Sequence, residues 1–256
     1  MAMFNDTQIS KAIANAYHEK MLDRIVSDVL IVGAGPAGLM AGFRLARAGR
    51  SVTIVEKKLS AGGGIWGGGM GMNDVAVQEE AIPILREIGV RHERRQEGLF
   101  MVDAVELASG LCFKAIQSGV VLLNLVTLED VSVQKGRVTG AVVNRTGISG
   151  VYHVDPLTFS AKATLDATGH EAVVVEHLRR RRILPDFPAG GPPMEGPMDA
   201  ASGEAFVVEK TGEVYPGLWV SGMSVCATFG GPRMGPIFGG MLLSGKRVAE
   251  LIATAL

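Results

Sequence analysis

One short segment of the sequence has the glycine spacing of a dinucleotide-binding turn. It reads Gly33-Ala34-Gly35-Pro36-Ala37-Gly38, with an apolar run before it and a helical pattern after it. In such a turn the first glycine allows a sharp bend from strand to helix. The second lets the backbone approach a pyrophosphate, and the third lets helix and strand pack closely. The phosphates would lie at a helix N-terminus, where free N–H groups favour negative charge. The turn therefore predicts a bound dinucleotide.

The acidic residue after this turn selects among the dinucleotides. Glu56 follows Gly38 by 18 residues, at the end of the next apolar run. A carboxylate there suits a ribose diol and disfavours a 2′-phosphate, so the sequence predicts NAD rather than NADP, although the adjacent Lys57 weakens the preference. FAD can use the same turn. Glutathione-reductase-like flavoproteins, however, have Gly-Asp after the last strand, whereas this chain has Gly222-Met223.

Two distant side chains, Asp155 and His170, have the chemistry of metal ligands. One carboxylate and one imidazole suit Fe(II), Mn(II) or Zn(II), and two protein ligands leave coordination positions open for a substrate. Alternatively, Asp155 caps a turn before Pro156 and His170 is an ordinary histidine at the end of a strand. Arg233 lies in a loop rich in glycine and proline, and its planar guanidinium would suit a carboxylate bidentately. Its alternative role is that of a surface arginine.

The elements that would position these residues follow from the hydrophobic pattern. A strand at 27–32, a helix at 39–48 after the glycine turn and a strand at 51–55 form a predicted βαβ unit. An amphipathic helix at about 8–24, capped by Asp6 or Thr7, precedes this unit. The seven glycines within residues 61–71 predict an irregular loop.

The second half of the chain predicts more strands than helices. A helix is expected at 77–87 despite Pro83, and another at 239–255. A loop or lid rich in proline and glycine is expected at about 185–203, and the four arginines at 179–182 favour a solvated helix face or a subunit contact. Strands are expected at 120–126, 131–134, 138–144 and 163–167, with one more at 218–221.

The first four of these strands are interpreted as a second, smaller sheet laid over the first. The predicted fold class is therefore α/β, a Rossmann-like FAD/NAD(P)-binding three-layer fold with a second smaller β-sheet. Residues 1–256 are expected to form a single domain.

Composition excludes several classes of protein. The formal net charge of −1 argues against a nucleic-acid binder. No apolar run approaches the ~18 residues of a membrane-spanning helix, and no secretory signal is visible. The two cysteines, Cys112 and Cys226, do not suggest a disulfide framework. A cytoplasmic protein with reduced thiols, and with neither nucleic-acid nor membrane partners, is expected.

Three longer motifs carry a family resemblance: residues 62–71, residues 154–156 together with 167–170, and residues 230–239. Together they resemble the thiamine thiazole synthases, from about residue 8 to the C-terminus. The resemblance implies that NAD, glycine and a sulfur source become an adenylated thiazole carboxylate with loss of nicotinamide, the work of a transferase acting on NAD. It also implies a homo-octamer in which Asp155 and His170 bind Fe(II) and Arg233 binds glycine. The residues implied to contact NAD are Gly33, Gly35, Ala37, Gly38, Glu56, Lys57, Gly64, Val126, His153, Val154, Asp155 and Met223.

His153 is a departure from one branch of this family. In the eukaryotic branch a cysteine stands two residues before the aspartate, and its sulfur is consumed to build the thiazole. On an extended segment His153 and Asp155 would project to the same face, and His153 could move a proton or orient a substrate but could not donate sulfur. The resemblance thus implies the branch that uses free sulfide and turns over repeatedly, with His153, Asp155 and His170 as catalytic residues. The alternatives are an FAD-dependent oxidoreductase of similar fold and a non-catalytic NAD-binding protein.

Overall fold

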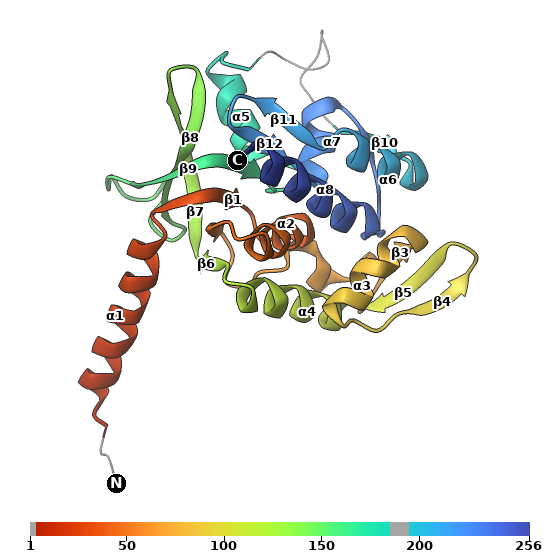
Figure 1. Ribbon diagram of the computed structural model, residues 1–256, viewed down its shortest axis with the longest axis horizontal. Coiled ribbons are helices and arrows are strands. Elements are labelled where there is room, and N and C mark those ends of the chain that lie inside the picture. Colours follow the sequence, from red (N-terminus) through yellow and green to blue (C-terminus); the bar gives the residue numbers. More distant parts are fainter. Residues whose placement is uncertain (1–3, 185–194) are drawn as a thin grey trace.

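A computed structural model describes residues 4–184 and 195–256, and its largest element is an eight-stranded sheet (Figure 1). The strands of this sheet are β1 (Val26–Val32), β2 (Val52–Glu56), β6 (Val121–Asn124), β7 (Val126–Gln134), β8 (Arg137–Arg145), β9 (Leu157–Asp166), β11 (Gly212–Tyr215) and β12 (Leu218–Val220). Their order is β11-β12-β9-β1-β2-β6, and the β7–β8 hairpin joins the sheet through β9. The pairs among β12, β9, β1, β2 and β6 are parallel.

Helices on both faces of the sheet make three layers, because the central strands are apolar on both sides. In β1, Val29 and Ile31 join one hydrophobic cluster, and Leu30 and Val32 join the other. The first cluster contains α2 (Pro36–Arg47), α3 (Ile82–Ile88), α4 (Ala104–Gln117) and α8 (Gly239–Ala255). The second contains α5 (Val173–Arg180) and α7 (Met223–Phe229), together with the β7–β8 hairpin. The predicted fold class is confirmed.

The smaller sheet is not the one expected from the sequence. It consists of β3 (Asp74–Gln78), β4 (Glu93–Gln96) and β5 (Leu99–Asp103), all antiparallel. The strands expected at 120–126, 131–134, 138–144 and 163–167 exist, but they extend the main sheet because β9 pairs directly with β1. The helix expected at 77–87 is also wrong in its first half. There β3 ends at Gln78, a single 3-10 turn covers Glu79–Ala81, and α3 begins one residue before Pro83.

Helix α1 (Asp6–Asp23) projects from the rest of the molecule (Figure 1). The expected caps Asp6 and Thr7 are wrong, because Asn5 forms a capping box with Gln8. The Asn5 side chain accepts a hydrogen bond from the Gln8 N–H at 2.9 Å, and the Gln8 side chain accepts one from the Asn5 N–H at 3.1 Å. Tyr17 and Met21 pack against the second cluster, whereas Ile9 and Ile13 on the same face are exposed.

The glycine-rich and proline-rich segments contain more structure than expected. Residues 61–71 include two short 3-10 helices, Gly63–Gly67 and Gly69–Gly71, rather than a purely irregular loop. Of the loop or lid expected at 185–203, residues 185–194 lie outside the described part of the chain. The remainder is not a loop: it contains β10 (Gly196–Met198), which pairs with β13 (Pro232–Arg233), and the start of α6 (Ala200–Glu209). Asp199 caps α6 by accepting a hydrogen bond from the Ser202 N–H at 3.1 Å.

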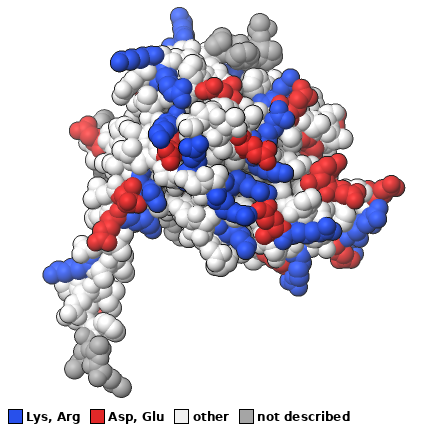
Figure 2. Space-filling model, in the orientation of Figure 1, with Lys and Arg blue, Asp and Glu red and all other residues white. Residues whose placement is uncertain are grey.

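Charged side chains of both signs are mixed over the face shown in Figure 2. The arginine run at 179–182 is not simply a solvated face, because Arg179 is buried and donates a hydrogen bond to the Thr228 carbonyl at 2.6 Å. Arg181 pairs with Asp130 at 2.5 Å. Among the described residues, no helix is both long and apolar enough to cross a membrane.

Candidate functional site

The glycine turn between β1 and α2 has no room for side chains at two positions. Gly33 has a φ of +102°, and a Cβ there would lie 2.5 Å from the Ala167 carbonyl oxygen. A Cβ on Gly38 would lie 2.2 Å from the Gly33 carbonyl oxygen. Gly38 therefore packs α2 closely against the turn and does not itself face the neighbouring cavity. Pro36 occupies the first turn of α2, where its missing N–H costs nothing.

Glu56 is buried at the end of β2 and binds the turn through both carboxylate oxygens. One oxygen accepts a hydrogen bond from the Ala34 N–H, and the other accepts one from the Lys58 N–H, each at 2.8 Å. The carboxylate thus fixes the glycine turn as well as presenting negative charge to the cavity. This structural role was not foreseen from the sequence.

A cavity of about 840 Å³ lies at the carboxyl ends of β1, β2 and β9, where ligands bind in open α/β sheets. Lys57 and Glu171, both on its lining, form an ion pair of 2.7 Å that lowers the pKa of the Glu171 carboxyl. The expected site residues that line this cavity are Gly33, Gly35, Ala37, Glu56, Lys57, Gly64, Val126, His170, Met223 and Arg233.

His170 and Arg233 both line this cavity, and both contact the same third residue, Glu195. The His170 Nδ1 lies 2.6 and 2.8 Å from the two carboxylate oxygens of Glu195. The Arg233 Nε lies 3.4 Å from one of those oxygens. Glu195 does not line the cavity, whereas both of its partners do. Sequence reasoning missed Glu195, because no local motif links residues so far apart in the chain.

A buried carboxylate, Asp166, fixes the turn that carries His170. It accepts hydrogen bonds from the N–H groups of Thr168, Val174 and Val175 and from the hydroxyls of Thr168 and Ser224. Burial raises the pKa of Asp166, while the hydrogen bonds from Thr168 oppose that rise. Ser224 also accepts a hydrogen bond from the Gly169 N–H at 3.0 Å, which ties the turn to α7. A polar residue at the end of an apolar strand was the signal that could have identified Asp166.

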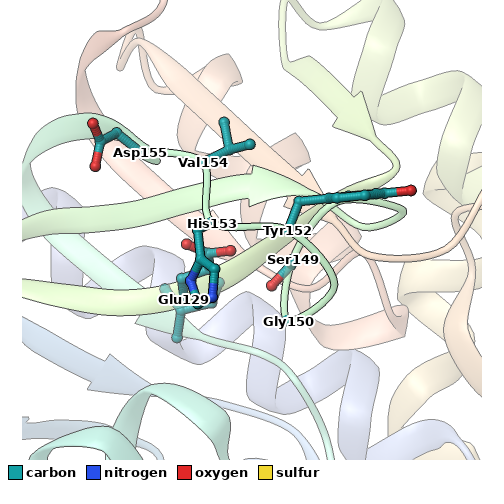
Figure 3. A pocket seen from close by; sticks show the side chains of 8 residues that line it. Glu129, Ser149, Gly150, Tyr152, His153, Val154 and Asp155 are labelled. Atoms are coloured by element: carbon teal, nitrogen blue, oxygen red, sulfur yellow. The ribbon is translucent and has the colours of Figure 1, made fainter.

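The segment that carries His153 and Asp155 lines a different cavity, of about 590 Å³, with Glu129 and Tyr152. The segment is not extended at His153, because the Val154 N–H donates to the Tyr152 carbonyl at 3.1 Å and closes a three-residue turn. His153 lies beside Glu129, and the Asp155 side chain points away from both (Figure 3). His153 and Asp155 therefore do not project to the same face, as they would on an extended segment.

Within one chain the expected metal ligands are not brought together. His170 lines the larger cavity, and Asp155 lines the smaller one. In the part of the chain that is described, no three His, Cys, Asp or Glu side chains form a group suited to a metal ion.

Both cysteines lie outside the two cavities. Cys226 is fully buried in α7, where burial, followed by Glu195 and Glu204, raises the pKa of its thiol to about 12. Cys112 is partly buried in α4, and burial raises the pKa of its thiol as well. Neither environment favours the thiolate, which is the reactive form.

Glu204 does not line the larger cavity, but it binds the backbone next to residues that do. This buried residue of α6 accepts a hydrogen bond from the Gly240 N–H at the start of α8, next to the lining residues Phe238 and Met241. Burial raises the pKa of the Glu204 carboxyl to about 7, against hydrogen bonds from Gly240 and Gln78.

The substitution Glu204→Gln should change how stability depends on pH. Because the pKa is raised in the folded state, Glu204 favours folding most below about pH 4.5, and this contribution is lost as the pH rises to about 7. The full loss is about 3 kcal/mol, and a neutral glutamine avoids it. Urea unfolding at pH 5 and pH 8 should show a smaller decrease for Glu204→Gln than for the wild type. Glu209→Gln, an exposed residue of the same helix, is the control. Equal pH dependence of the wild type and Glu204→Gln would contradict this assignment.

Comparisons with family models, known proteins and solved structures all find similarity to the same family. The Thi4 family model matches residues 10–238. A thiamine thiazole synthase from Thermococcus kodakarensis is 50% identical over 246 residues, which cover 95% of this chain and 96% of the relative. One from Thermotoga maritima is 46% identical, with 98% of each chain covered. The crystal structure of Thermovibrio ammonificans THI4 has a TM-score of 0.92 to this structure, at 43% identity and with 98% of each chain covered.

Proposed function

The chain belongs to the Thi4 family and is a thiamine thiazole synthase, and from this premise we propose its substrates and its sulfur source. The proposed reaction converts NAD, glycine and sulfide into an adenylated thiazole carboxylate with release of nicotinamide. The observation that carries the proposal is one cavity lined by the glycine turn, Glu56, His170 and Arg233. The flavin oxidoreductase and the non-catalytic NAD-binding protein fit less well, since the relatives named above are thiazole synthases.

The proposed NAD site uses the turn and the two residues that follow β2. The N–H groups in the first turn of α2 have no helical partners and suit a pyrophosphate. Glu56 places negative charge at the ribose end of the cavity, and its two backbone hydrogen bonds hold it in position. Lys57 stands beside it, already paired with Glu171.

This geometry leads us to expect that NADP binds at least ~10-fold more weakly than NAD, since ~1.4 kcal/mol of repulsion between Glu56 and a 2′-phosphate is a factor of ten. Calorimetric titration of the purified protein with each dinucleotide would measure the ratio. Glu56→Gln removes the charge and should bring the two affinities closer together. Equal affinity of the wild type for NAD and NADP would refute the proposed ribose contact.

Arg233 is the proposed binding group for the glycine carboxylate. Arg233 lines the cavity, and its Nε forms an ion pair of 3.4 Å with Glu195, so the two Nη groups are proposed to bind a second carboxylate. A guanidinium fork can donate two parallel hydrogen bonds to such a group. The residue therefore serves to hold and orient the amino acid.

Fe(II) is proposed to bind His170 and Asp155. The donor chemistry fits, because the His170 Nδ1 faces a carboxylate and its Nε2 is left for a ligand, as in many metal-binding histidines. Bound Fe(II) would supply a Lewis-acid centre with open coordination positions. Because Asp155 and His170 line different cavities of one chain, a second copy of the chain is proposed to contribute the Asp155 that completes a site with His170. The proposed homo-octamer would provide such neighbours.

The sulfur is proposed to come from solution. The position of the sacrificial cysteine is occupied by His153, and both thiols of the chain lie outside the two cavities. Their raised pKa values make either thiol a poor donor at neutral pH.

The experiment that tests the proposed reaction starts with NAD, glycine and Fe(II) under anaerobic conditions, with the protein as purified. Chromatography should detect free nicotinamide, and mass spectrometry should detect an adenylated product after sulfide is added. If NAD remains intact with all components present, the proposed substrates are wrong.

A further inference from the structure

Glu195 is held between two residues of the proposed site without facing the cavity itself. Its side chain is only 11% exposed, while those of His170 and Arg233 are each 58% exposed. It contacts the Nδ1 of His170 and the Nε of Arg233. These are the inner atoms of both side chains, and both residues line the cavity.

The contact at Nδ1 determines which nitrogen of His170 has a free lone pair. A neutral imidazole carries one proton, and a carboxylate at Nδ1 can only accept a hydrogen bond. The proton is therefore held at Nδ1, and the Nε2 is left unprotonated as a ligand or a base.

The contact at the Arg233 Nε has a comparable effect on the guanidinium. The ion pair of 3.4 Å joins Glu195 to the Nε side of the guanidinium, so the side formed by the two Nη groups is the one available to a second carboxylate. A charged acceptor also restricts the rotation of a long side chain that is more than half exposed. The Glu195 carboxylate thus contacts both His170, the candidate metal ligand, and Arg233, the residue proposed to bind the glycine carboxylate.

The backbone around Glu195 does not depend on its carboxylate. The Gly196 N–H donates to the Gly231 carbonyl at 2.8 Å, and the Asp199 N–H donates to the Arg233 carbonyl at 3.0 Å. These bonds attach β10 to β13 independently of the Glu195 side chain. Removal of the carboxylate should therefore leave this region folded.

We propose that Glu195 is a positioning residue that fixes the His170 tautomer and orients Arg233, so that the Nε2 and the Nη groups face the substrate cavity. The identity of the metal and of the amino acid rests on the proposed function, whereas the tautomer and the orientation do not.

The direct test is the tautomer of His170 in metal-free protein labelled with ¹⁵N-histidine. At a pH where the imidazole is neutral, NMR should show the proton at Nδ1, with the signal assigned by its loss in His170→Asn. Glu195→Ala should move the population toward Nε2–H. Glu195→Gln, whose amide oxygen can still accept the bond, should move it less. An Nε2–H tautomer in the wild type would overturn the proposal without any variant.

Titration with Co(II) as an oxygen-stable probe gives a second readout. Glu195→Ala should weaken Co(II) binding by ~10–100-fold, as losses of a histidine's supporting carboxylate do. Glu209→Ala, which removes an exposed carboxylate of the nearby α6, should leave it unchanged. Unchanged or tighter Co(II) binding in Glu195→Ala would contradict the positioning role. If the wild type binds no Co(II), the proposed metal site fails, and the NMR result still decides the role of Glu195.

Discussion

A mixture of Asp155→Ala and His170→Ala chains is expected to form the thiazole product, although neither variant does so alone. Each substitution removes a proposed Fe(II) ligand, and loss of several kcal/mol of stabilisation lowers the rate by more than ~100-fold. Because Asp155 and His170 line different cavities of one chain, the mixed assembly can pair an intact His170 with an intact Asp155 from a neighbour.

The expected recovery has a defined size. If each site takes one residue from each of two copies, random assembly of equal amounts restores about a quarter of the wild-type rate per chain. The chains would be co-expressed and purified through different tags on the two variants. A mixture of Asp155→Ala with the double variant should remain inactive and serves as the control. If the first mixture also stays inactive while its oligomeric state is normal, Asp155 and His170 do not complete a site between copies.

The second large effect concerns sulfur. Without added sulfide the enzyme is expected to make no thiazole, and with sulfide it should make more than one product per chain. The reason is that His153 contains no sulfur, while Cys112 and Cys226 line neither cavity and burial raises the pKa of both thiols. Sulfide held beside its electrophile would gain from proximity, which can lower a barrier by ~7 kcal/mol or more.

The variant Cys112→Ser with Cys226→Ala provides the matched control for this prediction. A chain without thiols should keep its sulfide-dependent activity if neither cysteine donates sulfur. Cys226 is fully buried in α7, so alanine is chosen there because serine would bury a polar hydroxyl in an apolar environment. Loss of activity from this folded variant would point to a cysteine as the donor.

The sequence predicted the β1–α2–β2 unit and its glycine turn well because steric rules act locally there. A strand buried on both faces, a glycine that needs a positive φ and a carboxylate at the next strand end each leave a signature within 30 residues. The same reasoning could have found α4, since its buried residues Ala104, Leu107, Ala108 and Leu111 follow the helical period after the capping Asp103.

The errors arose where pairing or assembly is decided by distant parts of the chain. The residues of a hydrophobic strand such as β9 do not indicate which strand it pairs with. The sequence therefore predicts β9 in a separate sheet, whereas it pairs with β1 in the main sheet. Glu195 meets His170 only through the tertiary fold. A motif containing Asp155 and His170 also cannot indicate whether both residues act in one chain or in two.

The measurement that tests the account most directly is the ratio of product to chain in an anaerobic reaction with NAD, glycine, Fe(II) and excess sulfide. Mass spectrometry would quantify the adenylated thiazole and weigh the intact chain in the same sample. The account predicts several products per chain and an unchanged chain mass. Product that stops at one per chain, with a chain about 34 Da lighter from loss of hydrogen sulfide at Cys112 or Cys226, would contradict it.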